Sequence, residues 1–168
     1  MSKPESDEAL AWVNDHFIFL ENRDGDTSSV ESILERAKSV VLRWGDGKSN
    51  SKGLRGLIID PYNYISQPSA GTSEHTSITN LLTRLISFAR FHSVHVWLVA
   101  HPAKMLTGPD GETAVPNGMN ISGSASFFAK ADCGATLARR NGVVELHVWK
   151  CRFKWAGSVG MVELDYDL

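Results

Sequence analysis

Two short apolar runs, each closed by one polar residue, constrain the fold of this chain most. The first is Gly-Leu-Ile-Ile-Asp, which ends at Asp60, and the second is Trp-Leu-Val-Ala-His, which ends at His101. Such runs are typical of buried strands in a parallel sheet, where ligand-binding and catalytic side chains follow the carboxyl ends of the strands. An amphipathic helix is predicted between them at about 74–92. The order strand, helix, strand predicts an α/β fold with a parallel sheet.

The N-terminal part of the chain extends this pattern. A helix is predicted over 27–44, where Ser28 and Glu31 form a capping box at its start. The run His-Phe-Ile-Phe-Leu at 16–20 predicts a further strand of the sheet. Residues 1–15 form a helical lead-in, whose helix at about 5–14 is expected to turn Leu10 and Val13 inward.

The C-terminal part of the chain differs in composition and in its predicted elements. Residues 102–124 are rich in glycine and proline and predict a long loop of the functional kind. A short helix near 124–131 and a strand at about 134–139 follow this loop. Two strands near 143–150 and 159–165 then predict an antiparallel hairpin.

Composition favours one cytoplasmic domain over residues 1–168. No apolar stretch reaches the roughly 20 residues that span a membrane, and the first residues are polar and acidic. Cys133 and Cys151 lack the spacing of a zinc site, so both are expected to be reduced structural cysteines. The net charge of -2 gives no overall nucleic-acid footprint, so any DNA contact must come from local loops.

A phosphate-binding loop is missing from the sequence. Gly47-Lys48-Ser49 matches the end of the signature Gly-x-x-x-x-Gly-Lys-[Ser/Thr], but Leu42 stands where its first glycine belongs. The segment also runs from helix to strand, whereas a phosphate loop runs from strand to helix. Residues 45–53 are therefore expected to be a polar surface loop.

The two strand-end groups allow two interpretations each. Asp60 can hold magnesium through water beside nucleotide phosphates, or it can simply begin the turn Asp-Pro-Tyr-Asn. His101 precedes a proline, a position where a histidine is more often structural than catalytic. Their joint placement at the ends of two strands favours a functional site.

A cluster of cations lies near the end of the predicted hairpin. Lys150, Arg152 and Lys154 alternate along the sequence, so on a strand they would face the same way and could bind one anion. The alternative is a solvated strand end, which is what most such charge runs are.

Four segments, in this order, resemble the C-terminal half of a RecA-type hexameric replicative helicase. They are Gly-Leu-Ile-Ile-Asp-Pro-Tyr-Asn, His-Val-Trp-Leu-Val-Ala-His-Pro, Ile-Ser-Gly-Ser-Ala-Ser-Phe-Phe-Ala-Lys-Ala-Asp and Trp-Lys-Cys-Arg-Phe. The resemblance spans residues 12–167 and is closest to phage primase-helicases and Twinkle-type helicases, with the bacterial DnaB type more distant. It implies a partial RecA-like, phosphate-loop NTPase sheet with flanking helices and the antiparallel hairpin at its end.

The resemblance also implies roles for individual residues. Asp60 matches the Walker B aspartate, which positions Mg²⁺ at ATP. His101 matches the polar residue that senses the γ-phosphate and relays its state to the DNA loops. Lys150 and Arg152 match a basic pair inserted into the ATP site of the neighbouring subunit, with Arg152 as the arginine finger. The implied partners are identical subunits in a hexameric ring.

The loop at 102–124 resembles the central-channel loop that grips single-stranded DNA. Backbone amides at small residues, together with one lysine per subunit, would bind DNA phosphates without a basic composition. The loop at 62–71 resembles a second such loop. The candidates for phosphate contacts are Lys104, Asn120, Ser122, Gly123 and Ser124.

The chain departs from the family where the phosphate loop and the general-base glutamate belong. Both precede the first matching strand, and Glu21 lies in the wrong place in the motif order. A fragment of a longer primase-helicase is expected, with a stand-alone remnant as the alternative. The chain alone would then need no cofactor and hydrolyse no ATP. In this family the phosphate-loop strand lies beside the strand at 94–100, so a gap in the sheet is also expected.

The function implied by the resemblance is ATP-dependent unwinding of duplex DNA by translocation along a single strand. Two alternatives remain open. One is a non-enzymatic DNA-binding or assembly module derived from a RecA-like ATPase. The other is a different RecA-type ATPase, such as a recombinase.

Overall fold

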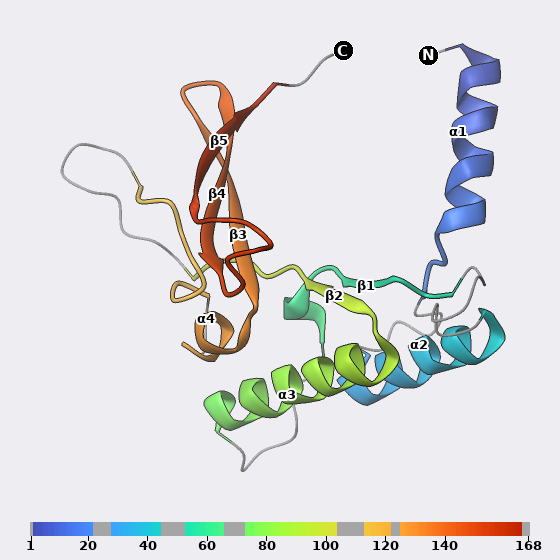
Figure 1. Cartoon of the computed structure of the whole chain (residues 1–168), viewed down its shortest axis with the longest axis horizontal. Coiled ribbons are helices and arrows are strands. Elements are labelled where there is room, and N and C mark those ends of the chain that lie inside the picture. The colour runs from blue at the N-terminus through green and yellow to red at the C-terminus, as the bar shows by residue number, and fades with distance from the viewer. Residues whose placement is uncertain are drawn as a thin grey trace.

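The computed structural model describes residues 2–21, 28–44, 53–65, 73–103, 113–121 and 125–165 (Figure 1). None of the helices in these ranges is long and apolar enough to cross a membrane. In chain order the elements are α1 (Lys3–His16), α2 (Val30–Trp44), β1 (Gly56–Ile59), the 3-10 helix η1 (Tyr62–Tyr64), α3 (Glu74–His92), β2 (His95–Leu98), α4 (Ser126–Lys130), β3 (Cys133–Arg140), β4 (Val143–Cys151) and β5 (Gly160–Leu164).

The predicted strand, helix, strand unit is confirmed. β1 and β2 pair in parallel, with Gly56 opposite His95 and Ile59 opposite Leu98. The connecting helix α3 begins where the side chain of Ser73 accepts a hydrogen bond from the backbone N–H of Thr76 at 3.2 Å. It ends at Ser93, whose left-handed conformation (φ 56°) stops the helix and turns the chain into β2.

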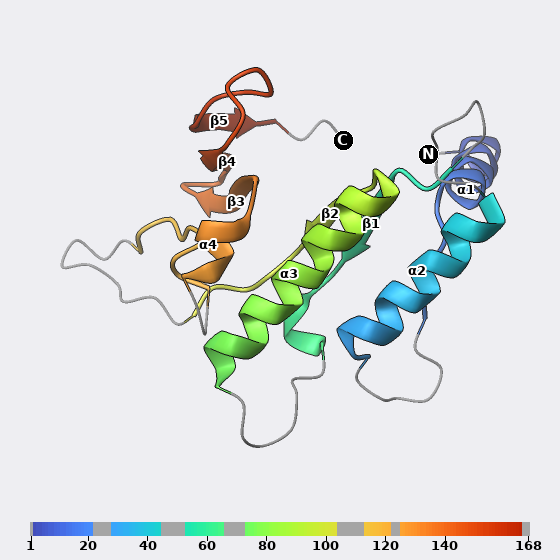
Figure 2. The ribbon, with the colours of Figure 1, turned by 60° about the horizontal axis from the view of Figure 1, so that its bottom comes forward.

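The core lies between the small parallel sheet and two helices. Figures 1 and 2 show α2 and α3 side by side on the same face of β1 and β2. Ile78 on α3 is completely buried, and the helices meet the sheet through residues spaced three or four apart, as predicted. The buried apolar residues are Val30, Leu34, Ala37, Val41, Leu57, Ile59, Tyr62, Ile65, Ile78, Leu81, Leu82, Leu85, Phe88, Val94 and Phe127.

The other face of the parallel sheet is open to solvent. Along β1 exposed and buried residues alternate, and Ile58 is 58% exposed. On β2 Trp97 is 61% exposed. Buried strands were predicted, and in the described part of the chain β1 is buried on one face only, because α2 and α3 cover that face alone.

The second sheet is antiparallel in the order β3-β4-β5, which confirms the predicted C-terminal hairpin. Asn141 and Gly142 join β3 to β4, and both have positive φ angles, 50° and 84°. A two-residue turn of this kind matches the twist of antiparallel strands. No strand pairing connects this sheet to β1 and β2 within the described ranges.

Helix α2 starts slightly later than its predicted capping box. The hydroxyl of Ser29 accepts a hydrogen bond from the backbone N–H of Ser32 at 3.2 Å, so Ser29 rather than Ser28 caps the helix. Glu31 instead forms an ion pair with Arg84 on α3 at 2.6 Å. The predicted box was therefore wrong in its partners, because with Ser29 as the cap the capping-box position is Ser32 rather than Glu31.

The N-terminal segment differs most from prediction. α1 projects away from the core (Figure 1), and it contains no buried residue. Leu10 is 60% exposed, so the prediction that it faces inward is wrong, while Val13 is half-buried. His16 ends α1, and residues 17–20 form no strand, because no described sheet edge pairs with them.

Candidate nucleotide and DNA site

Asp60 and His101 lie at the same edge of the parallel sheet. Backbone hydrogen bonds continue beyond the strands, from Val99 N to Ile59 O at 3.0 Å and from Tyr62 N to Val99 O at 2.7 Å. The backbone N–H of His101 then donates to Oδ1 of Asn63 at 3.4 Å. The two groups therefore follow the same end of neighbouring strands, as the sequence predicted, and both are exposed.

The turn after Asp60 is anchored in the core. Tyr62 is only 6% exposed, and its ring meets the ring of Phe127 on α4 edge-on, with 5.1 Å between centroids. Within the described ranges no donor or cation contacts the Asp60 carboxylate. The turn therefore fixes the backbone and leaves the carboxylate available to a ligand.

The site fits a magnesium ion that keeps most of its water. The described residues contain no group of three or more histidine, cysteine or acidic side chains that could hold a metal by themselves. Mg²⁺ beside nucleotide phosphates needs only one or two carboxylates, since water and phosphate oxygens supply its other ligands. A single exposed carboxylate such as Asp60 meets that requirement.

Lys150 and Arg152 converge on the C-terminal end of α4. Lys150 Nζ donates to the carbonyl oxygens of Phe128 and Ala129, the latter at 3.1 Å, and lies 5.1 Å from the centre of the Phe128 ring. Arg152 donates through Nη2 to Ala129 O at 3.3 Å and pairs through Nη1 with Asp132 at 2.7 Å. Cations are favourable at this end of a helix because its last carbonyls lack partners.

The predicted common face of the cations holds for two of them. Lys150 and Arg152 share the carbonyl of Ala129, so they reach the same side. β4 ends at Cys151, and Lys154 lies in the turn beyond it, where strand alternation no longer applies. Burial lowers the pKa of Lys150, the charge of Arg152 lowers it further, and Asp132 acts in the opposite direction.

Helix α4 lies between the two groups of predicted site residues. Its buried Phe127 packs on Tyr62, two positions after Asp60. The next residue, Phe128, offers its carbonyl and ring to Lys150. A shift of α4 would therefore change contacts both at the end of β1 and at the end of β4.

The ends of the predicted DNA-binding loop are joined beside His101. The backbone N–H of Ala103 donates to Asn120 O at 2.7 Å, and Pro102 forms an isolated bridge with Ile121. Oδ1 of Asn120 accepts the backbone N–H of Asn117 at 2.9 Å, so this predicted DNA contact also shapes the loop. Lys104, Ser122, Gly123 and Ser124 lie outside the described residues, as do the residues of the second predicted loop after position 65.

Trp149 connects this loop to the antiparallel sheet and was missed by sequence reasoning. Gly134 pairs with Lys150 and Ala135 with Val148, so Trp149 is the extra residue of a β-bulge. Its indole covers Gly134 and Gly118, where a Cβ would lie only 2.0 and 2.6 Å from the ring. The sequence signal for this contact was glycine at positions 118 and 134, because a glycine within a strand, such as Gly134, often marks the close approach of another group.

Thr136 completes the connection between loop and sheet. Its hydroxyl donates to Pro116 O at 2.7 Å and accepts from the indole nitrogen of Trp149 at 3.1 Å. The ring of Trp149 also stacks on Phe128 of α4, with 5.4 Å between centroids. The loop, the bulge and α4 therefore form one packed unit around Trp149.

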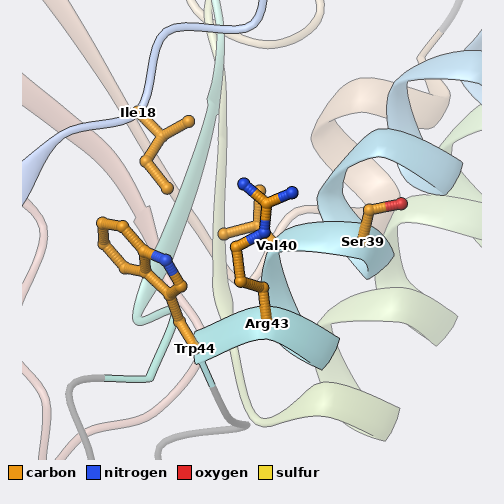
Figure 3. A pocket seen from close by; sticks show the side chains of 5 residues that line it. All are labelled: Ile18, Ser39, Val40, Arg43 and Trp44. Carbon is orange, nitrogen blue, oxygen red and sulfur yellow. The ribbon is translucent and has the colours of Figure 1, made fainter.

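A separate pocket of about 300 Å³ lies at the C-terminal end of α2 (Figure 3). None of the predicted site residues lines it, and most of its wall is hydrocarbon. The lining residues are Ile18, Ser39, Val40, Arg43 and Trp44.

Similarity to known proteins agrees with the resemblance seen in the motifs. The chain is 39% identical, over 99% of its length, to the Twinkle homolog protein, chloroplastic/mitochondrial, of Arabidopsis thaliana, and it spans 23% of that protein. No family model matches the chain.

Two solved structures share the fold. A DnaB-like replicative helicase, solved in a study of its interactions with primase, has a TM-score of 0.75 at 17% identity and covers 99% of this chain and 40% of its own. A solved ATPase domain has a TM-score of 0.73 at 18% identity and covers 96% of this chain and 56% of its own. The chain is thus similar over its whole length to part of a Twinkle-type protein, and it has the RecA-like fold of replicative helicase ATPase domains.

Proposed function

We propose that this chain is part of an ATP-dependent replicative DNA helicase of the primase-helicase type, which unwinds duplex DNA while moving along a single strand. The 39% identity to the Twinkle homolog along 99% of the chain carries this proposal. Because the chain spans only 23% of that relative, the activity is proposed for the whole protein. The exposed Asp60 and His101 at one sheet edge support it, since nucleotides bind at the carboxyl ends of such strands.

At the ATP site, the carboxylate of Asp60 would hold water molecules of the magnesium ion, and bound Mg-ATP would supply the phosphoryl chemistry. His101 would hydrogen-bond to the terminal phosphate. Its backbone is held by Asn63, and the chain passes directly from it into the loop closed by Ala103 and Asn120. A change at the phosphate would thus reach the DNA loop through only a few residues.

Lys150 and Arg152 would serve the ATP site of a neighbouring identical subunit in a hexameric ring. A guanidinium offers fixed donors to a phosphoryl group in transit. In the structure both cations bind carbonyls of α4 in their own chain, so they would have to exchange these partners for phosphate oxygens. The DNA contacts would come from Lys104, Asn120, Ser122, Gly123 and Ser124.

The chain by itself is proposed to lack ATPase activity, because its sequence contains no complete phosphate-loop signature. The predicted cytoplasmic location stays a prediction, and the matched relative is named for chloroplasts and mitochondria.

The test uses the whole protein that contains this segment, with magnesium, ATP and a forked DNA substrate. Asp60→Asn should lower ATPase and unwinding by about 100-fold or more, as expected for the loss of one electrostatic stabiliser. The matched control is Asp7→Asn, which makes the same change on exposed α1. Binding of single-stranded DNA without any ATPase in the wild-type protein would instead favour a DNA-binding module.

A further inference from the structure

Cys133 and Cys151 lie directly opposite each other across β3 and β4. At the next position along the ladder, Arg152 N donates to Asp132 O at 2.8 Å. Hydrogen-bonded and non-hydrogen-bonded pairs alternate in antiparallel sheets, so the two cysteines occupy a non-hydrogen-bonded pair, where Cα atoms are about 4.5 Å apart. Disulfides need a separation of about 4.4–6.8 Å, so the backbone already meets this requirement.

One of the two thiols is accessible to a solute. Both cysteines are free, Cys133 is exposed and Cys151 is half-buried. The Cys151 thiol donates weakly to the carbonyl of Phe153 at 3.4 Å. Burial raises the pKa of Cys133 above its ordinary value, and the charge and hydrogen bond of Cys151 raise it further, so the attacking thiolate forms more readily at alkaline pH. Solvent therefore reaches Cys133 more readily than Cys151.

We propose that Cys133 and Cys151 are a redox-active dithiol, which a small-molecule disulfide oxidises to a cross-strand disulfide. The Cys133 thiolate attacks one sulfur of the oxidant, forms a mixed disulfide and expels the other half as a thiolate. Cys151 gives its proton to solvent, attacks Cys133 Sγ and releases the second half. Two protein thiols are oxidised, and one solute disulfide is reduced to two thiols.

The position of this dithiol gives it a consequence for the cations beside it. Cys151 stands between Lys150 and Arg152, both of which reach the end of α4. A covalent link at Cys133 would tie β4 to the residue after Asp132, the partner of Arg152. Oxidation would then lower the ATPase rate of the whole protein. This consequence rests on the proposed function, whereas the disulfide itself does not.

The test treats the reduced protein with oxidised glutathione and maps its peptides by mass spectrometry. The wild type should lose both thiols together and yield a linked Cys133–Cys151 peptide pair that dithiothreitol reverses. Cys133→Ser and Cys151→Ser should each yield only a glutathione adduct on the remaining cysteine. Independent adducts on both cysteines of the wild type, or two unreacted thiols while an exposed model thiol is fully oxidised, would overturn the proposal.

A second readout separates this proposal from the helicase assignment. ATPase of the whole protein is measured before oxidation, after it, and after reduction. A linked peptide pair with no ATPase in any state would leave the dithiol standing and count against the helicase. Normal ATPase activity without a linked peptide pair would support the helicase assignment and overturn the dithiol proposal.

Discussion

Arg152 forms an ion pair with Asp132, with 2.7 Å between Nη1 and Oδ1. The two side chains are 39% and 48% exposed, so water screens their attraction. Ion pairs of this kind contribute about 0–1 kcal/mol to stability. The guanidinium is therefore positioned at the end of α4 without being locked there, which suits a group that must change partners.

Because this ion pair is weak, we expect substitutions of Asp132 and of Arg152 to have different effects. Asp132→Asn should change the free energy of unfolding by less than about 1 kcal/mol and the ATPase rate of the whole protein by less than about 10-fold. Arg152→Ala should lower that rate by about 1,000-fold or more, as expected for an arginine finger. Steady-state ATPase and urea unfolding measure both. Equal loss of ATPase in the two variants would show that Asp132 has a role beyond holding the arginine.

The contact of Trp149 with glycine predicts a steric effect. Gly134→Ala would place a Cβ 2.0 Å from the indole ring, and Gly118→Ala would place one at 2.6 Å. Overpacking of this kind costs about 1–3 kcal/mol. Urea unfolding with tryptophan fluorescence measures it. Gly160→Ala is the matched control, because no atom lies within 4 Å of its added Cβ; a similar loss there would refute the steric explanation.

The start of α1 should depend on pH. A hydrogen bond from the backbone N–H of Ser2, at 2.6 Å, and one from its side chain hold the pKa of Glu5 below its ordinary 4.5. The folded state therefore binds this proton less tightly than the unfolded state. Its stabilising contribution is present above pH 4.5 and is lost as the pH falls through the lowered pKa.

Amide exchange at the first turn of α1, followed by NMR during acidification, tests this dependence. Exchange should accelerate in the wild type as the pH falls below 4.5, beyond the intrinsic effect of pH on exchange. Glu5→Gln should remove the extra change, while Glu8→Gln should keep it. The same transition in Glu5→Gln would assign it to another group.

The open face of the parallel sheet predicts self-association of the chain when it folds alone. Ile58 and Trp97 expose large apolar side chains on this face, and exposed strand edges recruit partners. Light scattering should detect dimers or larger species, and Trp97→Lys should shift them toward monomer. Leu42→Lys on α2, where the leucine is 86% exposed, serves as control. A compact wild-type monomer would contradict this prediction.

Periodic segments were predictable from the sequence, and contacts between distant segments were not. Helix α3 and strands β1 and β2 follow from apolar spacing and from their bounding polar residues. The same reasoning placed Asp60 and His101 at one edge, because parallel neighbours end together. Residues 17–20 have the composition of a strand, but a strand also needs a partner edge, which composition does not supply.

Register was the second limit. Cys133 and Cys151 are 18 positions apart in sequence, and only the pairing of β3 with β4 brings them opposite each other. The bulge at Trp149 shifts that pairing by one residue, and no periodic signal marks it. The roles of Lys150 and Arg152 came from family resemblance, whereas their contacts with α4 required the packed structure.

The turn at Asn141 and Gly142 has a consequence for the order of folding. It joins strands that are adjacent in sequence, whereas β1 and β2 must first close a loop that contains all of α3. Hairpins form in about 1–10 μs, and longer-range pairing carries a larger entropic cost before any contact repays it. The sheet that leads to Lys150 and Arg152 can therefore begin to form early. Lys150 and Arg152 would then reach their final positions at a different time from the Asp60 carboxylate. The two groups would come together only when α4 packs on Tyr62.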